Sequence, residues 1–448
     1  MSDAPYKKKL IEVALPLDVI SEQSAREKSV RHGHPSTLHL WWARRPLAAC
    51  RAVLFAQLVD DPSSHPDKYP TEEAQEIERE RLFEIISALV KWENTGDEAL
   101  LESVRREIEI SSEGKLPTIL DPFAGGGSIP LEAQRLGLEV NASDLNPVPV
   151  LLNKALIEIP PRWSGMKPVH PEANNKAHWA SSYGLAEDIR LYGLWMKDEL
   201  WNRVGTSYPM VKLADNSEVR AIAWIWARTV TCSNPICGKE MPLLRSFLLS
   251  KKAGRNSWIV PIVDKDKIKF EVKTGKTAPN QEGTVDRRGA RCLFCESYVD
   301  LKHIRSEGRK GGIGFQLAAI VAEGDRKREY LSPNSLHESA ALTGKPDATL
   351  VGEMPEKALG FRVQAYGMTD YFDLFSDRQL TSLVALSDLI EEVRKKIILD
   401  ACSAGMEDKQ ASAYADGVST YLAFVIDKCA DYWSVLCSWN APGQKIRN

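Results

Sequence analysis

The stretch PTILDPFAGGGSIPLEAQRLGLEVNASDLN, residues 117–146, decides the fold expected for this chain. A short apolar run at 118–120 is typical of a buried strand, and it ends at Asp121. The glycines at 125–127 predict a tight turn, because glycine adopts left-handed conformations and lets the backbone approach a ligand. Apolar residues within 129–136 then recur at helical spacing, and Ser128 is positioned to cap this helix. Beyond the helix, apolar and other residues alternate up to Asp144, which is typical of a second strand. The stretch therefore predicts a β-turn-α-β unit.

Each predicted strand ends at an acidic residue, and the two residues suggest a ligand. Asp144 lies 19 residues after Gly125, where a carboxylate can accept hydrogen bonds from the hydroxyls of a ribose held over the turn. Asp121 would repel a pyrophosphate but could bind an ammonium group. A cationic nucleoside cofactor such as S-adenosylmethionine fits this pattern better than a dinucleotide. The alternative is that the turn needs glycine only for packing.

These residues also carry a family resemblance. DPFAGGGSIPLEA, followed by SDLNP, resembles the cofactor motifs of amino-group DNA methyltransferases, and in particular the adenine-specific DNA methylases that contain a zinc ribbon. The resemblance implies an α/β fold, with a Rossmann-like methyltransferase core, an inserted zinc-ribbon module and flanking helices. It also implies that the S-adenosylmethionine pocket is lined by Asp121, Phe123, Gly125 and Gly127, and that Asp144 holds the ribose.

Composition indicates a globular protein. The 448 residues are 43% hydrophobic and 27% charged, which is typical of a soluble chain with two to three domains. No apolar run approaches the roughly 20 residues of a membrane span, and the first residues lack the pattern of a secretory signal. We therefore expect a cytoplasmic protein with no membrane partner.

Four of the eight cysteines fall into two close pairs. Cys232 and Cys237 lie in TCSNPICGKE, and Cys292 and Cys295 lie in RCLFCES. Two short cysteine turns can present four thiolates to one tetrahedral Zn²⁺, and a reducing compartment favours metal over disulfides. The spacing predicts a zinc site despite an unusually long insertion of 54 residues between the pairs. The alternative is a set of buried free thiols.

Charge is segregated along the chain. Residues 231–330 hold 20 Lys and Arg against 12 Asp and Glu, although the whole chain carries a net charge of −3. Such a basic block with interleaved aromatic residues predicts phosphate contacts and base stacking. The family resemblance implies that the partner is DNA. Scattered surface lysines are the alternative. The basic residues singled out are Arg245, Lys251, Lys252, Arg255, Arg287, Arg288, Arg291, Lys302, Arg305, Arg309 and Lys310, and the aromatic ones are Trp258, Tyr298 and Phe315.

The N-terminal block crowds histidine, tryptophan and arginine into SVRHGHPSTLHLWWARRPLAAC. In the resembling family such a block lies on the cofactor side, so His34, Trp42 and Arg45 are candidate pocket residues. The alternative is a tryptophan-anchored core flanked by solvated arginines. After Pro46 the pattern predicts an amphipathic helix, with its inner face formed by Leu47, Cys50, Val53, Leu54 and Leu58.

Five segments follow from these patterns. They are an N-terminal pocket and helical segment (1–60), a charged helical hairpin (61–112), the cofactor-binding βαβ core with a helical extension (113–225), a basic zinc-ribbon insert (226–330) and a loop followed by helices (331–448). The charged hairpin is expected to bury one stripe, formed by Leu82, Ile85, Ile86 and Leu89.

One expected motif is missing from the sequence. Amino methyltransferases hold the amino group of a flipped base against Asp or Asn followed by two prolines and an aromatic residue. The nearest stretches, at 146–149, 159–163 and 369–373, lack this pattern, so no catalytic residue is assigned. In the family the motif follows a helical region like 376–440, so we expect a split or truncated enzyme whose catalytic strand lies outside this chain. In the case of a split enzyme, a second chain would carry the motif.

The predicted function is therefore the cofactor-binding and DNA-binding portion of a DNA adenine-N6 methyltransferase. Two alternatives stay open: an RNA base methyltransferase, and a non-catalytic subunit that binds zinc and nucleic acid.

Overall fold

A computed structural model describes residues 6–174, 178–347, 350–357, 360 and 362–447. The chain divides into two compact units, each built from two chain segments. Unit 1 comprises Met1–Tyr192 and Arg394–Phe424, and unit 2 comprises Gly193–Val393 and Val425–Asn448. The divisions fall within or at the ends of three long helices, which are α8 (Tyr183–Val204), α11 (Asp377–Ser403) and α12 (Asp408–Tyr432).

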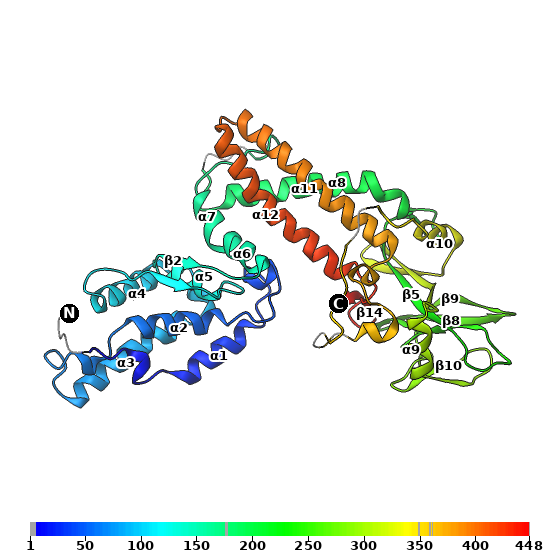
Figure 1. The fold of residues 1–448 in the computed structure, drawn as a ribbon, viewed down its shortest axis with the longest axis horizontal. Coiled ribbons are helices and arrows are strands. Elements are labelled where there is room, and N and C mark those ends of the chain that lie inside the picture. The colour runs from blue at the N-terminus through cyan, green and yellow to red at the C-terminus, as the bar shows by residue number, and fades with distance from the viewer. Residues whose placement is uncertain (1–5, 175–177, 348–349, 358–359, 361, 448) are drawn as a thin grey trace. The chain divides into compact units, whose positions relative to one another are not determined.

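Unit 1 begins with a layer of helices around one apolar core, drawn in blue in Figure 1. The helices are α1 (Leu17–Glu27), α2 (Leu47–Leu58), α3 (Glu72–Leu89) and α4 (Glu98–Ser111), with short 3₁₀ turns η1 (Leu10–Glu12), η2 (Pro35–Thr37), η3 (Pro62–Ser64) and η4 (Trp92–Asn94). The charged hairpin is confirmed as α3 and α4, and Leu82, Ile86 and Leu89 are buried in the core while Ile85 packs against it.

Helix α2 differs from its prediction at one position. Val53 is 45% exposed, so its placement on the inner face is wrong. The helix contacts α1, α3 and α5. Ala52 and Phe55, on either side of Val53 in sequence, are fully buried among the packed helices. A single stripe of apolar residues could not show that several helices would surround α2.

The predicted β-turn-α-β unit is present in unit 1. Strand β1 (Ile119–Asp121) and strand β2 (Val140–Ala142) pair in parallel, with α5 (Ser128–Arg135) between them in sequence. Ile119 and Val140 pack against the helical core, whereas Leu120, on the other face of β1, is 71% exposed. Among the described residues no third strand joins this sheet, so the complete methyltransferase core stays a prediction.

Further helices complete unit 1. They are α6 (Pro147–Asn153), the π-helical turn η5 (Lys154–Glu158), α7 (Ile159–Arg162), the first part of α8, and the adjoining parts of α11 and α12. A buried carboxylate holds several of these segments together. Asp188 accepts hydrogen bonds from the backbone N–H groups of Val169 and His170, at 2.8 and 2.9 Å, and from the Tyr414 hydroxyl at 2.5 Å.

Unit 2 is built around antiparallel strands. A four-stranded sheet has the order β13-β12-β5-β6, with β5 (Ala221–Thr231), β6 (Glu240–Leu243), β12 (Gly314–Gly324) and β13 (Lys327–Leu331). A second sheet is the meander β7 (Leu248–Lys252), β8 (Arg255–Asp264) and β9 (Lys267–Gly275). Apolar residues of both sheets, including Ala227, Ile259 and Phe270, share one core. The apolar run AIAWIWARTV at 221–230 forms most of β5.

Smaller elements of unit 2 flank these sheets. They are the hairpins β3 (Val211–Lys212) with β4 (Glu218–Val219), β10 (Gly289–Arg291) with β11 (Tyr298–Asp300), and β14 (Ser438–Asn440) with β15 (Lys445–Arg447), the helices α9 (Leu301–Arg309) and α10 (Ser335–Ala341), and the 3₁₀ turns η6 (Gly205–Ser207), η7 (Val363–Tyr366) and η8 (Tyr371–Leu374). In the described part of the chain, no helix combines the length and apolar character needed to cross a membrane.

Candidate functional site

The glycine turn follows β1 and carries backbone conformations that favour glycine. Gly125 and Gly127 have φ values of +48° and +76°. A Cβ on Gly127 would lie 2.9 Å from the Asn153 side-chain oxygen, so the turn has no room for a larger residue there. Gly127 also precedes α5 as its N-cap residue. The Ser128 hydroxyl instead donates to the Arg45 carbonyl at 2.7 Å, so the expectation that Ser128 caps the helix is wrong.

Asp144 connects the end of β2 to the glycine turn. One carboxylate oxygen accepts a hydrogen bond from the Gly125 N–H at 2.9 Å, and the other accepts from the Asn146 N–H at 2.9 Å. Hydrogen bonds from Asn146 and Gly125 lower the pKa of Asp144, so the side chain is a carboxylate near neutral pH. Each oxygen keeps a further lone pair that can accept from a ligand hydroxyl.

Asp121 lies at the matching end of β1. Its carboxylate accepts a hydrogen bond from the Phe123 N–H at 3.2 Å. The Phe123 side chain is 85% exposed, and Leu145, next to Asp144, is fully exposed. The carboxyl ends of the two parallel strands therefore combine two carboxylates with exposed apolar side chains. This arrangement can bind hydroxyl donors and a cation beside an apolar surface.

Three side chains outside the predicted set contact the turn. Arg44 donates a hydrogen bond to the Gly126 carbonyl, and a Cβ on Gly125 would lie 3.2 Å from the Trp41 indole nitrogen. Asn153 donates to the Gly125 carbonyl at 3.2 Å. The run WWARR signalled the region but not which arginine or tryptophan faces the turn.

The Arg44 guanidinium keeps unused donors. Its Nε and Nη2 atoms are buried and have no hydrogen-bond partner among the described residues. Burial lowers the pKa of Arg44 to about 10, which still leaves it charged near neutral pH. A buried cation with free N–H groups is suited to bind an anionic group of a ligand, because an unpaired buried charge is otherwise destabilising.

The three N-terminal pocket candidates lie in different surroundings. His34 is buried and its Nε2 lies 2.8 Å from the Glu27 carboxylate, which also accepts the Leu47 and Ala48 N–H groups at the start of α2. Trp42 is 82% exposed and stacks on Trp41, with ring centroids 4.2 Å apart. Arg45 has an exposed side chain. His34 therefore contacts Glu27, the carboxylate that caps the start of α2. Trp42 is linked to the glycine turn only through its stack on Trp41.

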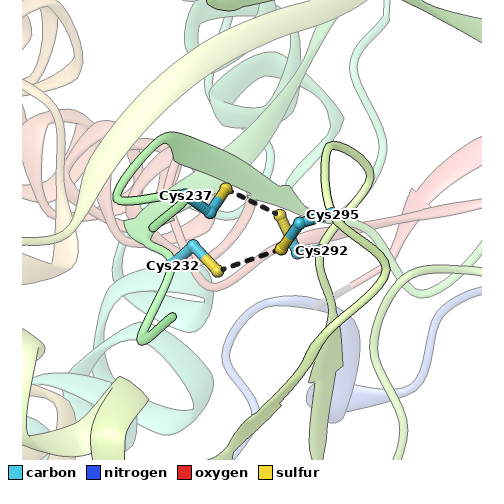
Figure 2. Close-up of side chains that lie close together, drawn as sticks. All are labelled: Cys232, Cys237, Cys292 and Cys295. Atoms are coloured by element: carbon cyan, nitrogen blue, oxygen red, sulfur yellow. Dashed lines mark hydrogen bonds between the residues drawn. The ribbon is translucent and has the colours of Figure 1, made fainter. Parts of the chain in front are cut away.

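The four paired cysteines come together in unit 2. Cys232 and Cys237 lie between β5 and β6, and Cys292 and Cys295 lie between β10 and β11 (Figure 2). The Sγ atoms are 3.7 Å apart for Cys232 and Cys295 and 3.9 Å apart for Cys237 and Cys292, and all four lie within 4.8 Å of one another. Sulfur atoms around a tetrahedral zinc with bonds of about 2.3 Å are separated by about 3.8 Å. The cluster could hold a metal ion.

The two cysteine loops share a backbone geometry. The Cys232 N–H donates to the Lys239 carbonyl at 2.9 Å, and the Cys292 N–H donates to the Ser297 carbonyl at 3.0 Å. The residue after the second cysteine of each pair has a positive φ, +52° at Gly238 and +59° at Glu296. Each loop turns tightly, so that both of its thiols point toward the other loop. Asn234 joins the loops, since its Nδ2 lies 3.8 Å from the Cys295 sulfur and donates to the Ser297 hydroxyl at 3.1 Å.

Three of the four thiols have pKa values shifted from the ordinary cysteine value. Burial raises the pKa of Cys232 to about 12 and also raises the pKa of Cys292. Hydrogen bonds from Ser297 lower the pKa of Cys295 to about 6. Two buried thiols that resist ionisation are suited to a metal, because a bound cation stabilises thiolates that burial alone would disfavour.

Most of the predicted basic residues lie on the surface of unit 2. Arg287, Arg288 and Arg291 are exposed at β10 and the turn before it. Some of the others have acidic partners, since Arg255 pairs with Glu329 at 3.2 Å and Lys310 pairs with Glu307 at 3.2 Å. The residues that are exposed and form no ion pair with any described residue are Arg245, Lys251, Lys252, Arg287, Arg288, Arg291, Lys302 and Arg309. Their charges are available to phosphates.

The aromatic candidates of the same block are divided between core and surface. Trp258 is partly buried in β8, whereas the side chains of Tyr298 and Phe315 are exposed. Arg228 lies over the Phe315 ring, 5.9 Å from its centroid. Tyr298 and Phe315 are therefore the two candidates that remain accessible for stacking.

Comparison with known proteins adds one partial match. Residues 14–85 match the model of a family described as "Protein of unknown function (DUF1156)". This segment runs from α1 to within α3, and it contains Glu27, His34, Trp41 and Arg44. No curated protein and no solved structure matches the chain. The matched description names no activity, so the function is argued from the geometry of the two sites.

Proposed function

We propose that the chain is the part of a DNA adenine-N6 methyltransferase that binds S-adenosylmethionine and DNA. One observation carries the proposal: the Asp144 carboxylate accepts the Gly125 N–H at 2.9 Å, which brings an ionised acceptor to the glycine turn at the carboxyl ends of parallel strands. Nucleoside ligands of parallel α/β sheets bind at such ends. When bound, the cofactor supplies an electrophilic methyl group.

Each residue around the turn has a role in this proposal. Asp144 accepts hydrogen bonds from the ribose hydroxyls through its remaining lone pairs, and Asp121 attracts the positive charge of the ligand. The unpartnered Nε and Nη2 atoms of Arg44 donate hydrogen bonds to the carboxylate of the methionine moiety, which satisfies a buried cation. Phe123, Gly125 and Gly127 line the site, and Trp42 contributes through its stack on Trp41.

The four-cysteine cluster has a structural role in the proposal. We assign Zn²⁺ to it, because four thiolates at these separations suit a closed tetrahedral site without an open coordination position. The cytoplasm, where we expect the protein to reside, keeps such thiols reduced. The ion would hold the β5–β6 and β10–β11 loops together, and Arg287, Arg288 and Arg291 beside them would contact phosphates of DNA.

The proposal includes a second chain. Parallel sheets are normally covered on both faces and contain more than two strands, whereas β1 and β2 form a two-stranded sheet with Leu120 exposed. A partner that supplies further strands would cover Leu120 and pair with the free strand edges. We propose that this partner carries the Asp-Pro-Pro-aromatic motif that holds the target base.

Calorimetry with S-adenosylmethionine tests the cofactor assignment. We expect Asp144→Asn to weaken binding by about 10- to 100-fold, because hydrogen bonds to a charged acceptor contribute about 1.5–3 kcal/mol each. Asp97→Asn is the matched control, since Asp97 caps α4 in the same unit and remains a cap as asparagine. Absence of any binding to the unmodified chain would instead favour the alternative of a non-catalytic subunit that binds zinc and nucleic acid.

Transfer of labelled methyl groups tests the substrate. With the partner chain present, we expect label on adenine N6 of duplex DNA. Label on RNA alone would favour the RNA base methyltransferase alternative, and label on cytosine would contradict the assignment to adenine.

A further inference from the structure

A cavity lies in unit 2, away from the cysteine loops in sequence. It has a volume of about 360 Å³ and is lined by the β14–β15 hairpin together with residues from β5, β13 and the end of α12. Trp439 of β14 faces Ile446 of β15 in the hairpin register, and both residues line the cavity. A volume of this size is at the lower end of the range for small-ligand sites.

The cavity has an aromatic lining that is fixed on one side. The Trp439 indole N–H donates to the Leu249 carbonyl at 2.7 Å, and the ring of Tyr330 meets Trp439 edge-on at 6.2 Å between centroids. Tyr432, at the end of α12, is 41% exposed and also lines the cavity. The Trp439 ring is therefore held by contacts with β7 and β13, whereas the Tyr432 ring is partly exposed to solvent. Such rings can stack on a planar ligand with little loss of side-chain freedom.

The charged residues that line this cavity are all cations. They are Arg328 of β13 and Lys445 and Arg447 of β15. None of the three forms an ion pair with a described residue, and the described lining includes no Asp or Glu. Lys445 and Arg447 are exposed and lie on one face of β15, at the rim of the cavity. Ile446 lies between them in sequence, on the other face of the hairpin, which it shares with Trp439. Three unneutralised cations around an apolar, aromatic cavity favour a ligand with a flat ring and an anionic group.

We propose that this cavity binds one unpaired nucleotide of a nucleic-acid strand. The base lies against Tyr432 and the Trp439 face, and Arg328, Lys445 and Arg447 contact the phosphates on either side of it. A base in a duplex has both faces covered by its neighbours, so only an unpaired base can use such a cavity. The inference rests on the proposed function in one respect, namely that this unit binds nucleic acid.

The test measures binding of the full chain to a fluorescein-labelled single strand of about ten nucleotides. We expect Tyr432→Ala to weaken binding about tenfold, which is typical of losing one stacked base. Lys445→Gln should lower the slope of log K against log salt by about 0.7, as expected for one lost phosphate contact on a single strand. The matched control is Lys409→Gln, because Lys409 is exposed near the start of α12 and forms no ion pair with a described residue.

Two further measurements separate the outcomes. A set of strands is compared, each with a single abasic site at a different position. For the unmodified chain, we expect weaker binding when the abasic site is at one particular position. For Tyr432→Ala, we expect all strands of the set to bind equally. A free mononucleotide should compete only weakly, since it lacks one of the flanking phosphates. Competition as strong as that of the strand would overturn the assignment to a nucleic-acid strand.

The possible failures of the two proposals are distinguishable. If the chain binds no nucleic acid, both the nucleic-acid part of the proposed function and this inference fail. If the strand binds but Tyr432→Ala and Lys445→Gln behave like Lys409→Gln, only the inference about this cavity fails. Thermal unfolding and metal content of each variant show that the fold is retained, and ultraviolet cross-linking of a 5-iododeoxyuridine strand to the peptide carrying Tyr432 or Trp439 gives a readout independent of affinity.

Discussion

The four-cysteine cluster and the glycine turn are built in contrasting ways. The cluster consists of four side chains from two hairpin loops, and its Sγ atoms lie within 4.8 Å of one another. The turn consists mainly of backbone, to which Asp144 brings a carboxylate from 19 residues beyond Gly125 and Arg44 brings a guanidinium from 82 residues before Gly126. The ligand set of the cluster is complete within its unit, whereas the turn ends a sheet that has only two strands among the described residues.

This difference concerns how much each site depends on its surroundings. A closed set of four thiols needs only the two loops, so its geometry is fixed by local hydrogen bonds such as those of Cys232 and Cys292. The turn needs Trp41, Arg44 and Asn153 to shape it, and it leaves Leu120 and Phe123 exposed. Local sequence therefore specifies the first site well and the second only in part.

The largest effect is expected from removing a metal ligand. Cys292→Ser should abolish stoichiometric zinc binding and destabilise unit 2 by about 5 kcal/mol or more, because zinc binding to structural sites is worth at least about 10 kcal/mol. Metal analysis together with denaturant unfolding measures both. Cys402→Ser should keep the metal, since Cys402 contacts Asp408 outside the cluster. Unchanged metal content in Cys292→Ser would contradict the assignment of this residue as a ligand.

The next effect concerns the backbone of the turn. Gly127→Ala should destabilise unit 1 by about 2–4 kcal/mol, because it combines a left-handed φ of +76° with a Cβ only 2.9 Å from Asn153. Gly165→Ala has a similar φ of +74° but meets no atom within 4 Å, so only the conformational part of about 1 kcal/mol should remain. Equal losses in the two variants, measured by denaturant unfolding, would mean that packing around the turn contributes little.

A smaller effect is expected where His34 meets the helix cap. Burial alone would raise the pKa of Glu27, but hydrogen bonds from His34 and from the Leu47 and Ala48 N–H groups lower it overall. A lowered pKa in the folded state stabilises the protein above the unfolded pKa, and this contribution is lost as pH falls through the folded value. Glu27→Gln should therefore lower stability by about 2 kcal/mol at neutral pH.

The same variant should also flatten the loss of stability that begins as pH falls through the ordinary glutamate pKa and continues below it. Stability measured at several pH values checks this expectation. Glu22→Gln, at an exposed position of the same helix, should leave the dependence unchanged. If Glu27→Gln loses stability at acidic pH as steeply as the unmodified chain, another titrating group causes that loss.

The smallest effect is expected for a residue that hydrogen-bonds to the four-cysteine cluster. Asn234→Ala should weaken zinc affinity about tenfold, or about 1.4 kcal/mol, because residues that hydrogen-bond to ligands orient them and tune the metal. Competition with a chelator measures the affinity, and Ser233→Ala in the same loop serves as the control. If both variants hold zinc as tightly as the unmodified chain, the link from Asn234 to Cys295 is dispensable.

Much of the local structure could be predicted, for reasons visible in particular residues. The apolar spacing of Leu82, Ile86 and Leu89 specified α3, and the glycines followed by a helical repeat specified the turn and α5. The predictions that Val53 lies on the inner face of α2 and that Ser128 caps α5 were wrong, because the direction of each side chain depends on which neighbours surround it. Val53 points to solvent on a helix with several neighbours, and Ser128 is engaged by the Arg45 carbonyl.

By itself the sequence determined the β-turn-α-β unit, the acidic residues at its strand ends and the pairing of the four cysteines, because each depends on contacts between residues close in sequence or on the chemistry of a short motif. Only the tertiary structure decided that Arg44, rather than Arg45, donates to the turn, that His34 supports the cap of α2, and that the β14–β15 hairpin encloses a cavity with Tyr432 and Arg328. The physical reason is that the partners in these contacts are selected by packing between elements rather than by a spacing that the sequence displays, and the Arg44 contact joins residues 82 positions apart.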